Sequence, residues 1–182
     1  VLSLIAMIIL LPIYLILAVG VKCSSRGPIF YKQERVGRYG KPFNIIKFRS
    51  MCVDAESDKP LLSSKNDSRI TSFGKFLRKT HLDETPQFFN VLRGDMSLVG
   101  PRPERQYFID QIVKVAPYYK LLQSIRPGLT SWGQVKFGYA ENVEEMVERL
   151  RWDILYLENM SLSMDLKILI HTALIVFKGS GK

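Results

Sequence analysis

The sequence predicts an α+β fold that is mostly helical, and three patterns in the chain support this. Residues 1–21 are apolar and uncharged, and residues 143–158 place apolar side chains at helical spacing (positions 143, 146, 147, 150, 154 and 157). Residues 29–33 and 43–51 resemble short strands that flank a glycine-containing turn at residues 37–40, which predicts a small β-hairpin. A chain of 182 residues is long enough to bury a hydrophobic core without disulfides or a structural metal.

The N-terminal apolar segment is long enough to enter a membrane. Residues 1–21 match the length of a transmembrane helix and exceed that of a typical buried helix. Pro12 interrupts the segment near its middle, and a proline inside a helix removes one hydrogen bond and clashes with the preceding turn. From the residues alone two outcomes stay open. One is a kinked helix that spans the membrane, which is slightly favoured, and the other is a helix–break–helix that enters and leaves by the same face.

The formal net charge of +9 is concentrated directly after this apolar segment. Residues 22–50 contain eight lysines and arginines and a single acid, Glu34. Basic residues beside a membrane segment are typical of its cytoplasmic flank and attract anionic lipid headgroups. Because the charge lies next to the apolar segment and the chain has no nucleic-acid-binding motif, nucleic acid is not an expected partner.

The segment that follows the hairpin is expected to begin with a polar loop over residues 54–68. Ser72 is the expected N-cap of a helix that runs to about residue 79. A second helix is expected over about residues 84–93, with Gly94 as its C-terminal stop.

Two further helical segments are expected in the C-terminal half. Residues 104–124 have an aromatic, amphipathic pattern that is interrupted near Pro117 and suits either a core or a membrane interface. Residues 166–177 are apolar nearly all round but too few to span a membrane. We therefore expect that helix to be buried or to lie on a membrane surface.

Asp83 and Glu84 are the strongest candidates for chemistry. An aspartate and a glutamate are also ordinary residues for the first turn of a helix, so the pair alone is weak evidence for a site. A carboxylate at a helix N-terminus is held ionised by the helix dipole, so it can act as a nucleophile or hold a metal ion. A second carboxylate beside it can share a divalent cation or move a proton. The same helix end attracts phosphate.

Arg102 is the strongest candidate for binding a phosphate. It lies between Pro101 and Pro103, which restrict the backbone to extended geometry and aim the side chain at little further entropic cost. Arginine binds phosphate through two hydrogen bonds at once. Other cationic candidates are Lys47, Arg49, Arg78 and Arg126, which as a set match the charge of a diphosphate.

These motifs resemble those of the bacterial sugar transferases, the monotopic polyprenol-phosphate phosphoglycosyl transferases. The similarity covers nearly the whole chain. It includes the apolar segment broken at Pro12, Lys-Phe-Arg-Ser-Met at residues 47–51, and Arg-Pro-Gly-x-Thr at residues 126–130. Its longest part runs from Leu-Asp-Glu-x-Pro-Gln to Val-Gly-Pro-Arg-Pro over residues 82–103. A motif of that length is not a chance match.

The resemblance implies a two-step transfer reaction. Asp83 would attack the β-phosphate of a UDP-sugar, release UMP and carry the phosphosugar as an aspartyl phosphate. A polyprenol phosphate such as undecaprenyl phosphate would then accept it, which is the first membrane step of glycoconjugate or exopolysaccharide synthesis. Asp83 and Glu84 would be the catalytic residues and would hold Mg²⁺. The substrate-binding residues would be Arg102, Lys47, Arg49, Arg78, Arg126 and Gln87.

The resemblance also implies a topology. Residues 1–22 would form a re-entrant membrane anchor broken at Pro12. Residues 23–182 would form a compact catalytic domain with amphipathic membrane-interface helices at the cytoplasmic face of the bacterial inner membrane. The expected partners are therefore a UDP-sugar, polyprenol phosphate and membrane phospholipids. The transferred sugar, the downstream glycan, homo-oligomer formation and any segment before Val1 stay open.

Three positions depart from the family pattern. The serine that often precedes the hinge proline is Leu11, and the Thr-Gly pair after Arg-Pro-Gly is Thr130-Ser131. A common downstream Gly-Arg is Gly138-Tyr139. The later departures fall in a region that could select the donor sugar, so the sugar is not carried over from the family.

Two rival functions differ in their expected products. A membrane phosphohydrolase would release free sugar phosphate without any polyprenol acceptor. A basic lipid-binding protein, with the acidic pair only capping a helix, would bind liposomes in a salt-sensitive manner and release no UMP.

Overall fold

The computed structural model describes residues 2–53, 55, 60–62 and 67–178 and confirms a mixed, mostly helical α/β architecture. Most of the loop expected over residues 54–68, and residues 179–182, lie outside the described residues. The α-helices are α1 (Leu2–Ser24), α2 (Ser72–Lys79), α3 (Gln87–Arg93), α4 (Gln106–Val115), α5 (Trp132–Lys136), α6 (Val143–Glu158) and α7 (Leu162–Phe177). The strands are β1 (Phe30–Val36), β2 (Pro42–Phe48), β3 (Ser97–Val99) and β4 (Gly128–Thr130), and the 3₁₀ helices are η1 (Arg38–Gly40), η2 (Leu82–Glu84) and η3 (Pro117–Ser124).

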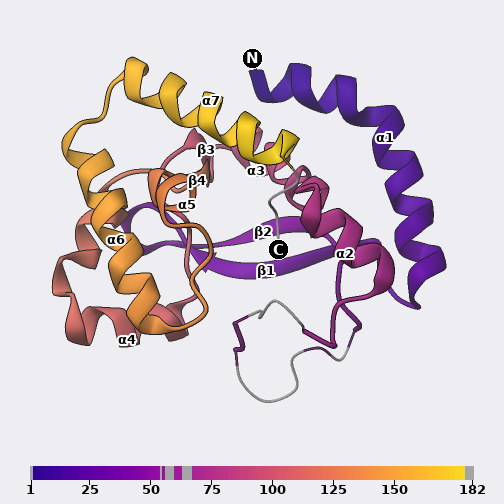
Figure 1. Cartoon of the computed structure of the whole chain (residues 1–182), viewed down its shortest axis with the longest axis horizontal. Helices are drawn as coiled ribbons and strands as arrows, with labels where there is room; N and C mark the ends of the chain where they lie inside the picture. The colour runs from indigo at the N-terminus through magenta and orange to yellow at the C-terminus, as the bar shows by residue number, and fades with distance from the viewer. Residues whose placement is uncertain (1, 54, 56–59, 63–66, 179–182) are drawn as a thin grey trace.

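The predicted hairpin is confirmed, with strand bounds that differ from those expected. Strands β1 and β2 pair antiparallel from Phe30↔Phe48 to Val36↔Pro42, so the first strand is longer and the second shorter than the sequence predicts. Strand β2 ends before Met51, which pairs instead with Ile70 in an isolated bridge. The hairpin runs through the middle of the molecule, with α4 and α6 toward one end and α1 and α2 toward the other (Figure 1).

Asn90 fastens α3 to the hairpin. This side chain is fully buried, its amide nitrogen donates to the Asn44 carbonyl at 2.7 Å, and its Oδ1 accepts from the Ile46 N–H at 3.1 Å. The amide therefore satisfies one donor and one acceptor of β2 at once, which fixes the position of the segment that follows Asp83 and Glu84.

Strands β3 and β4 form a parallel pair that the sequence analysis did not predict. Ser97 lies opposite Gly128 and Val99 opposite Thr130. A Cβ atom on Gly128 would lie 2.2 Å from the Gly100 nitrogen, so the close approach of the two strands requires glycine there. Each strand has three residues, which is too short to show an alternating pattern.

Helix α1 is the one helix among the described residues that is long and apolar enough to cross a membrane. It keeps Pro12 inside a continuous helix and bends near its middle: its N-terminal half runs across the top of the view and its C-terminal half descends on the right (Figure 1). On the inner side, Leu17 and Val21 pack against Phe48 and Leu77. Its outward apolar side chains are exposed: Leu2, Leu4, Ile5, Ile8, Ile9, Leu11, Ile13, Leu15, Ile16 and Val19.

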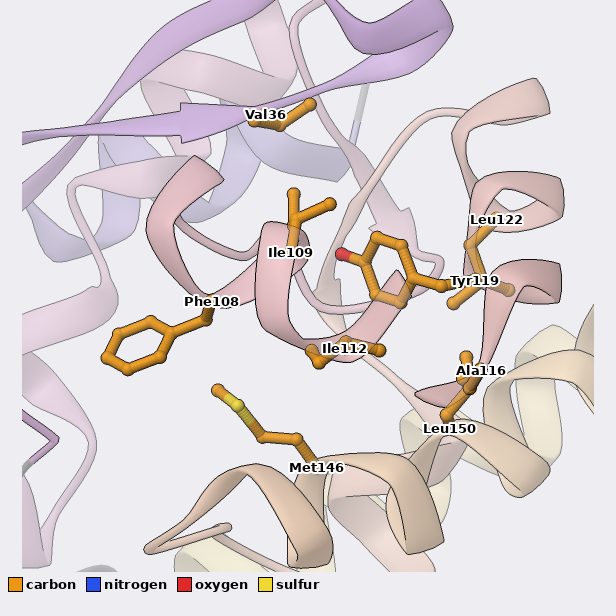
Figure 2. Close-up of a cluster of buried hydrophobic side chains, with 9 residues drawn as sticks. All are labelled: Val36, Phe108, Ile109, Ile112, Ala116, Tyr119, Leu122, Met146 and Leu150. Atoms are coloured by element: carbon orange, nitrogen blue, oxygen red, sulfur yellow. The ribbon is translucent and has the colours of Figure 1, made fainter. Parts of the chain in front are cut away.

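The largest buried cluster joins α4, η3 and α6 (Figure 2). Its members are Val36, Phe108, Ile109, Ile112, Ala116, Tyr119, Leu122, Met146 and Leu150. The helix bounds of α6 match the predicted stripe, and its Met146 points toward Phe108 of α4 (Figure 2). The interruption expected near Pro117 is also present, because α4 ends at Val115 and η3 starts at Pro117.

Helix α7 buries one side and exposes the other. Ile168 is fully buried against Val99, Trp132 and Tyr156, whereas Leu162, Leu166, Ile170 and Leu174, spaced four residues apart, are exposed. The helix is therefore amphipathic in place, although its sequence is apolar nearly all round.

Candidate active site

Asp83 and Glu84 lie in the 3₁₀ turn η2 rather than in the first turn of the following α-helix, which corrects the helix start expected at residue 84. Helix α3 begins at Gln87 because Pro86 has no N–H to donate and fits only the start of a helix. His81, directly before the turn, is left-handed with φ 57°. The predicted stop is confirmed, since Gly94 caps α3 with φ 89°.

The expected cap of α2 is also corrected by one residue. The hydroxyl of Thr71, not that of Ser72, accepts the Gly74 N–H at 2.9 Å. Gly74 has to be a glycine, since a Cβ atom there would lie 1.9 Å from the Ser50 carbonyl oxygen. This contact seats α2, and with it Arg78, against the end of the hairpin.

Glu84 lies between two cations from distant parts of the chain. Its Oε1 is 2.5 Å from Lys47 Nζ, on β2, and 3.5 Å from Arg102 Nη2, in the segment after β3. All three side chains are mostly buried, with 13–16% of each exposed. The fold thus brings residues 47, 84 and 102, which are far apart in sequence, into contact.

The two neighbouring acids have opposite electrostatics. Burial raises the pKa of Glu84, but Lys47 and Arg102 outweigh burial and lower this pKa far below its ordinary value. Burial and the adjacent Glu84 charge raise the pKa of Asp83 above its ordinary value, and Lys47 and Arg78 offset this in part. Glu84 is therefore a fixed anion, whereas Asp83 becomes a stable carboxylate more readily when further positive charge arrives.

These residues line a cavity of about 460 Å³. Its polar lining includes Lys47, Arg78, Asp83, Glu84 and Arg102. Arg78 Nε donates to Ser50 Oγ at 2.9 Å, which holds that side chain at the cavity wall. This group of three cations and two acids is suited to an anion that carries several charges, such as a diphosphate.

Three residues expected to bind substrate have other surroundings. Arg49 also lines the cavity, but its guanidinium donates to the carbonyls of Ser25 (2.8 Å) and Arg26, so it fastens the end of α1 to the hairpin. Gln87 is 4% exposed in α3, and Arg126 is exposed just before β4. Neither Gln87 nor Arg126 belongs to the cavity lining.

Several site residues were not among the predicted ones. Tyr139 lines the cavity, and its ring lies 5.7 Å from the Arg102 guanidinium carbon. Glu104 binds Arg35 at 3.3 Å and Arg149 at 2.5 Å, and it follows Arg102 by two residues. Two signals were available in the sequence: Glu104 is close to Arg102, and Gly138-Tyr139 departs from the family pattern in a region that could select the donor sugar. The contacts themselves join distant segments.

The oxygen donors of the site fit a magnesium ion that binds together with substrate. The described residues contain no cluster of three or more His, Cys, Asp and Glu side chains suited to a metal ion. Mg²⁺ commonly takes only one or two protein carboxylates and completes its shell with water and substrate phosphates. Asp83 and Glu84 match that donor set, and a cation beside them would counter the raised pKa of Asp83.

An exposed apolar helix, and paired carboxylates with several cations around one cavity, are the features expected of a membrane-associated site for phosphate chemistry. The chain matches the bacterial sugar transferase family over residues 1–179 and belongs to that family.

Curated relatives agree with this assignment. The chain is 42% identical over 170 residues to the UDP-N-acetylgalactosamine-undecaprenyl-phosphate N-acetylgalactosaminephosphotransferase of Aeromonas hydrophila. This match covers 93% of the chain and 40% of the relative. It is 44% identical over 175 residues to the UDP-glucose:undecaprenyl-phosphate glucose-1-phosphate transferase of Klebsiella pneumoniae (95% and 37%). The protein with the same name in Escherichia coli K12 is 41% identical over 182 residues (98% and 38%). The chain thus spans about two fifths of the length of these relatives.

Proposed function

We propose that this chain transfers a sugar phosphate from a UDP-sugar to undecaprenyl phosphate, with polyprenol-diphosphate-sugar and UMP as products. The names of the relatives support this reaction, and they specify different sugars. The observation that carries the proposal is the Asp83–Glu84 turn, which faces Lys47, Arg78 and Arg102 across one cavity.

In the first step the Asp83 carboxylate attacks the β-phosphorus of the UDP-sugar. A bond forms between an Asp83 oxygen and phosphorus, and the bond from that phosphorus to the bridging oxygen breaks. UMP leaves with the bridging oxygen, and the phosphosugar stays on Asp83. Lys47, Arg78 and Arg102 neutralise the diphosphate, as phosphoryl transfer requires above all positioning and charge stabilisation.

In the second step a phosphate oxygen of the polyprenol phosphate attacks the same phosphorus. The bond to Asp83 breaks, and the free carboxylate is regenerated. Glu84 keeps Lys47 and Arg102 in place throughout, because its low pKa keeps it charged. Mg²⁺ held by Asp83 and Glu84 would supply additional positive charge at the phosphates.

The membrane part of the proposal rests on the exposed apolar side chains. Residues 1–22 form a re-entrant anchor bent at Pro12, and residues 23–182 form the catalytic domain on the cytoplasmic face of the bacterial inner membrane. The bend of α1 and the exposed leucines and isoleucines of α1 and α7 support this arrangement. The basic residues after α1 would contact anionic phospholipid.

The covalent step is tested by intact-protein mass spectrometry. The protein is mixed with Mg²⁺ and a panel of UDP-sugars without acceptor, and UMP release is measured in parallel. We expect a phosphosugar adduct that is absent from Asp83→Asn. Full turnover by Asp83→Asn would contradict the role of Asp83, and release of free sugar phosphate without acceptor would indicate a hydrolase.

The topology is tested separately by labelling. A cysteine introduced at Leu2, in a variant with both native cysteines replaced by serine, should react with a membrane-impermeant reagent only from the cytoplasmic side. Labelling from the outer side would show that α1 spans the membrane.

A further inference from the structure

Tyr139 connects the two opposing parts of the candidate active site. It follows α5 in a loop where Gly138 is left-handed with φ 92°, and it lines the same cavity as Asp83. The guanidinium carbon of Arg102 lies 5.7 Å from the centre of its ring, which is within the range of a cation–π contact. Arg102 in turn binds Glu84.

The same side chain also contacts the segment that carries the acids. The rings of Tyr139 and His81 are stacked, with centres 6.2 Å apart and planes 10° from parallel. The Tyr139 hydroxyl lies 3.3 Å from His81 Nδ1. His81 is the left-handed residue two positions before Asp83, so Tyr139 is held against the start of the acidic turn.

The surroundings keep this phenol neutral. Burial, followed by the charges of Glu84 and Asp83, raises the pKa of Tyr139, and Arg102 offsets this in part. The neutral ring presents its electron-rich face to cations, and the contact is stronger where water is excluded.

We infer that Tyr139 is a positioning residue for Arg102: its ring, fixed in place by His81, holds the Arg102 guanidinium in the orientation that binds the diphosphate of the donor. This inference rests on the proposed function. The ring supplies the effect on Arg102, and the hydroxyl only helps to hold the ring. A phenylalanine should therefore replace the tyrosine with little loss, whereas an alanine should not.

The test is a double-mutant cycle on the whole chain in detergent or nanodiscs. Tyr139→Ala, Arg102→Ala, the double variant and Tyr139→Phe are compared for KM and kcat of UMP release. We expect Tyr139→Ala to raise KM for the UDP-sugar about tenfold with a smaller change in kcat, and Tyr139→Phe to stay within about threefold of the wild type. The double variant should be no worse than Arg102→Ala. Tyr118→Ala, an exposed tyrosine outside the cavity lining, is the matched control and should change nothing.

Losses that multiply in the double variant would show that Tyr139 acts independently of Arg102, and a Tyr139→Phe variant as weak as Tyr139→Ala would exclude the ring as the active part. Either result overturns the inference. Calorimetry of UDP binding with Mg²⁺, carried out on the same variants, distinguishes a failure of the inference about Tyr139 from a failure of the proposed function. If the wild type binds UDP but transfers no phosphosugar, the proposed function is refuted. The role of Tyr139 is still tested in that case, because the Kd values of the single and double variants form the same double-mutant cycle.

Discussion

Among the described residues, two glutamates each lie between two cations, and the two arrangements have different consequences. Glu84 contacts Lys47 and Arg102, and Glu104 contacts Arg35 and Arg149, with shortest distances of 2.5 Å in both. The two clusters are adjacent, because Arg102 belongs to one and Glu104, two residues later, to the other.

The difference is the neighbouring acid. Beside Glu84 lies Asp83, a buried carboxyl whose pKa is raised and which forms no ion pair of its own with another described residue. Glu104 also lies near a buried acid, Asp153, whose pKa burial raises to about 6. Asp153, however, does not line the cavity, and its Oδ1 accepts the Gly133 N–H at 2.9 Å. The two oxygens of Glu104 are each used by one arginine. The comparison teaches that a buried ion-pair cluster by itself indicates only structure. The Glu84 cluster differs because its additional acid, Asp83, itself lines the cavity and can gain from incoming positive charge.

The largest expected effect is a loss of activity on substitution of Asp83, the acid that lies beside the Glu84 cluster. Asp83→Asn should lower the rate of UMP release by at least about a thousandfold, because an amide does not form the phosphorus bond. The free energy of unfolding of Asp83→Asn should be equal to or higher than that of the wild type, because asparagine has no charge to bury. A stopped-flow or end-point assay of UMP, with thermal unfolding of the same sample, measures both. A strongly destabilised variant would mean that Asp83 is held as a structural anion.

The next largest expected effect is a loss of stability on substitution of Glu104, at the centre of the other cluster. Glu104→Ala leaves Arg35 and Arg149 buried without their shared carboxylate, so the free energy of unfolding should fall by about 3–5 kcal/mol. Chemical denaturation in detergent measures this. Glu34→Ala, which removes an exposed glutamate of β1, is the control and should have little effect. A loss no larger than that of the control would show that the segment after Arg102 is anchored elsewhere.

The pH dependence should follow Asp83 rather than Glu84. The attacking group is the carboxylate, and the pKa of Asp83 is raised, so the single-turnover rate of adduct formation should fall about tenfold per pH unit below that pKa. Glu84 stays ionised throughout this range, because its pKa is lowered. Because bound Mg²⁺ would counter this shift, the midpoint should move to higher pH as the Mg²⁺ concentration is lowered, and a midpoint that does not depend on Mg²⁺ would contradict the placement of Mg²⁺ beside Asp83.

The raised pKa of Asp83 also makes the free energy of unfolding depend on pH. A raised folded-state pKa means that the charged form of Asp83 costs stability above that pKa, and that the cost disappears below the unfolded-state value. In buffer with a chelator, the wild type should therefore be less stable than Asp83→Asn near neutral pH, and the two should converge as the pH falls. Parallel curves would refute this.

The smallest expected effect concerns the link between α1 and the catalytic turn. The Tyr14 hydroxyl donates to the Thr85 carbonyl at 3.0 Å, one residue after the acidic pair, and its ring packs against Phe48. Tyr14→Phe should lower the free energy of unfolding by about 1 kcal/mol and keep the ring contact. Tyr107→Phe, at an exposed position, is the matched control. Equal changes in both variants would show that the hydrogen bond contributes nothing particular.

Sequence reasoning succeeded where a local pattern carries the information. The stripe of α6 and the stop at Gly94 are local, and both are confirmed. The grouping of Lys47, Arg78 and Arg102 around the acids was expected from their charge and from the family resemblance, and the structure brings these residues to one cavity.

Sequence reasoning did not reach features that depend on contacts between distant segments. Strands β3 and β4 are too short for a pattern and pair across an intervening α4 and η3. Arg49 and Arg78 are both cations in the part of the chain that precedes the acidic pair, yet only the fold shows that the Arg49 guanidinium binds the end of α1. Tyr139 lies 37 positions after Arg102, so no local sequence pattern indicates the contact between them.

The side chain of Asn90 has a consequence for how the protein behaves with copies of itself. The backbone groups of Asn44 and Ile46 that it binds lie along the side of β2 that faces away from β1. An open strand edge is a template on which another chain can add a strand and start to aggregate. By occupying these groups with a side-chain amide, the protein blocks this part of the β2 edge against strand addition without building a third strand.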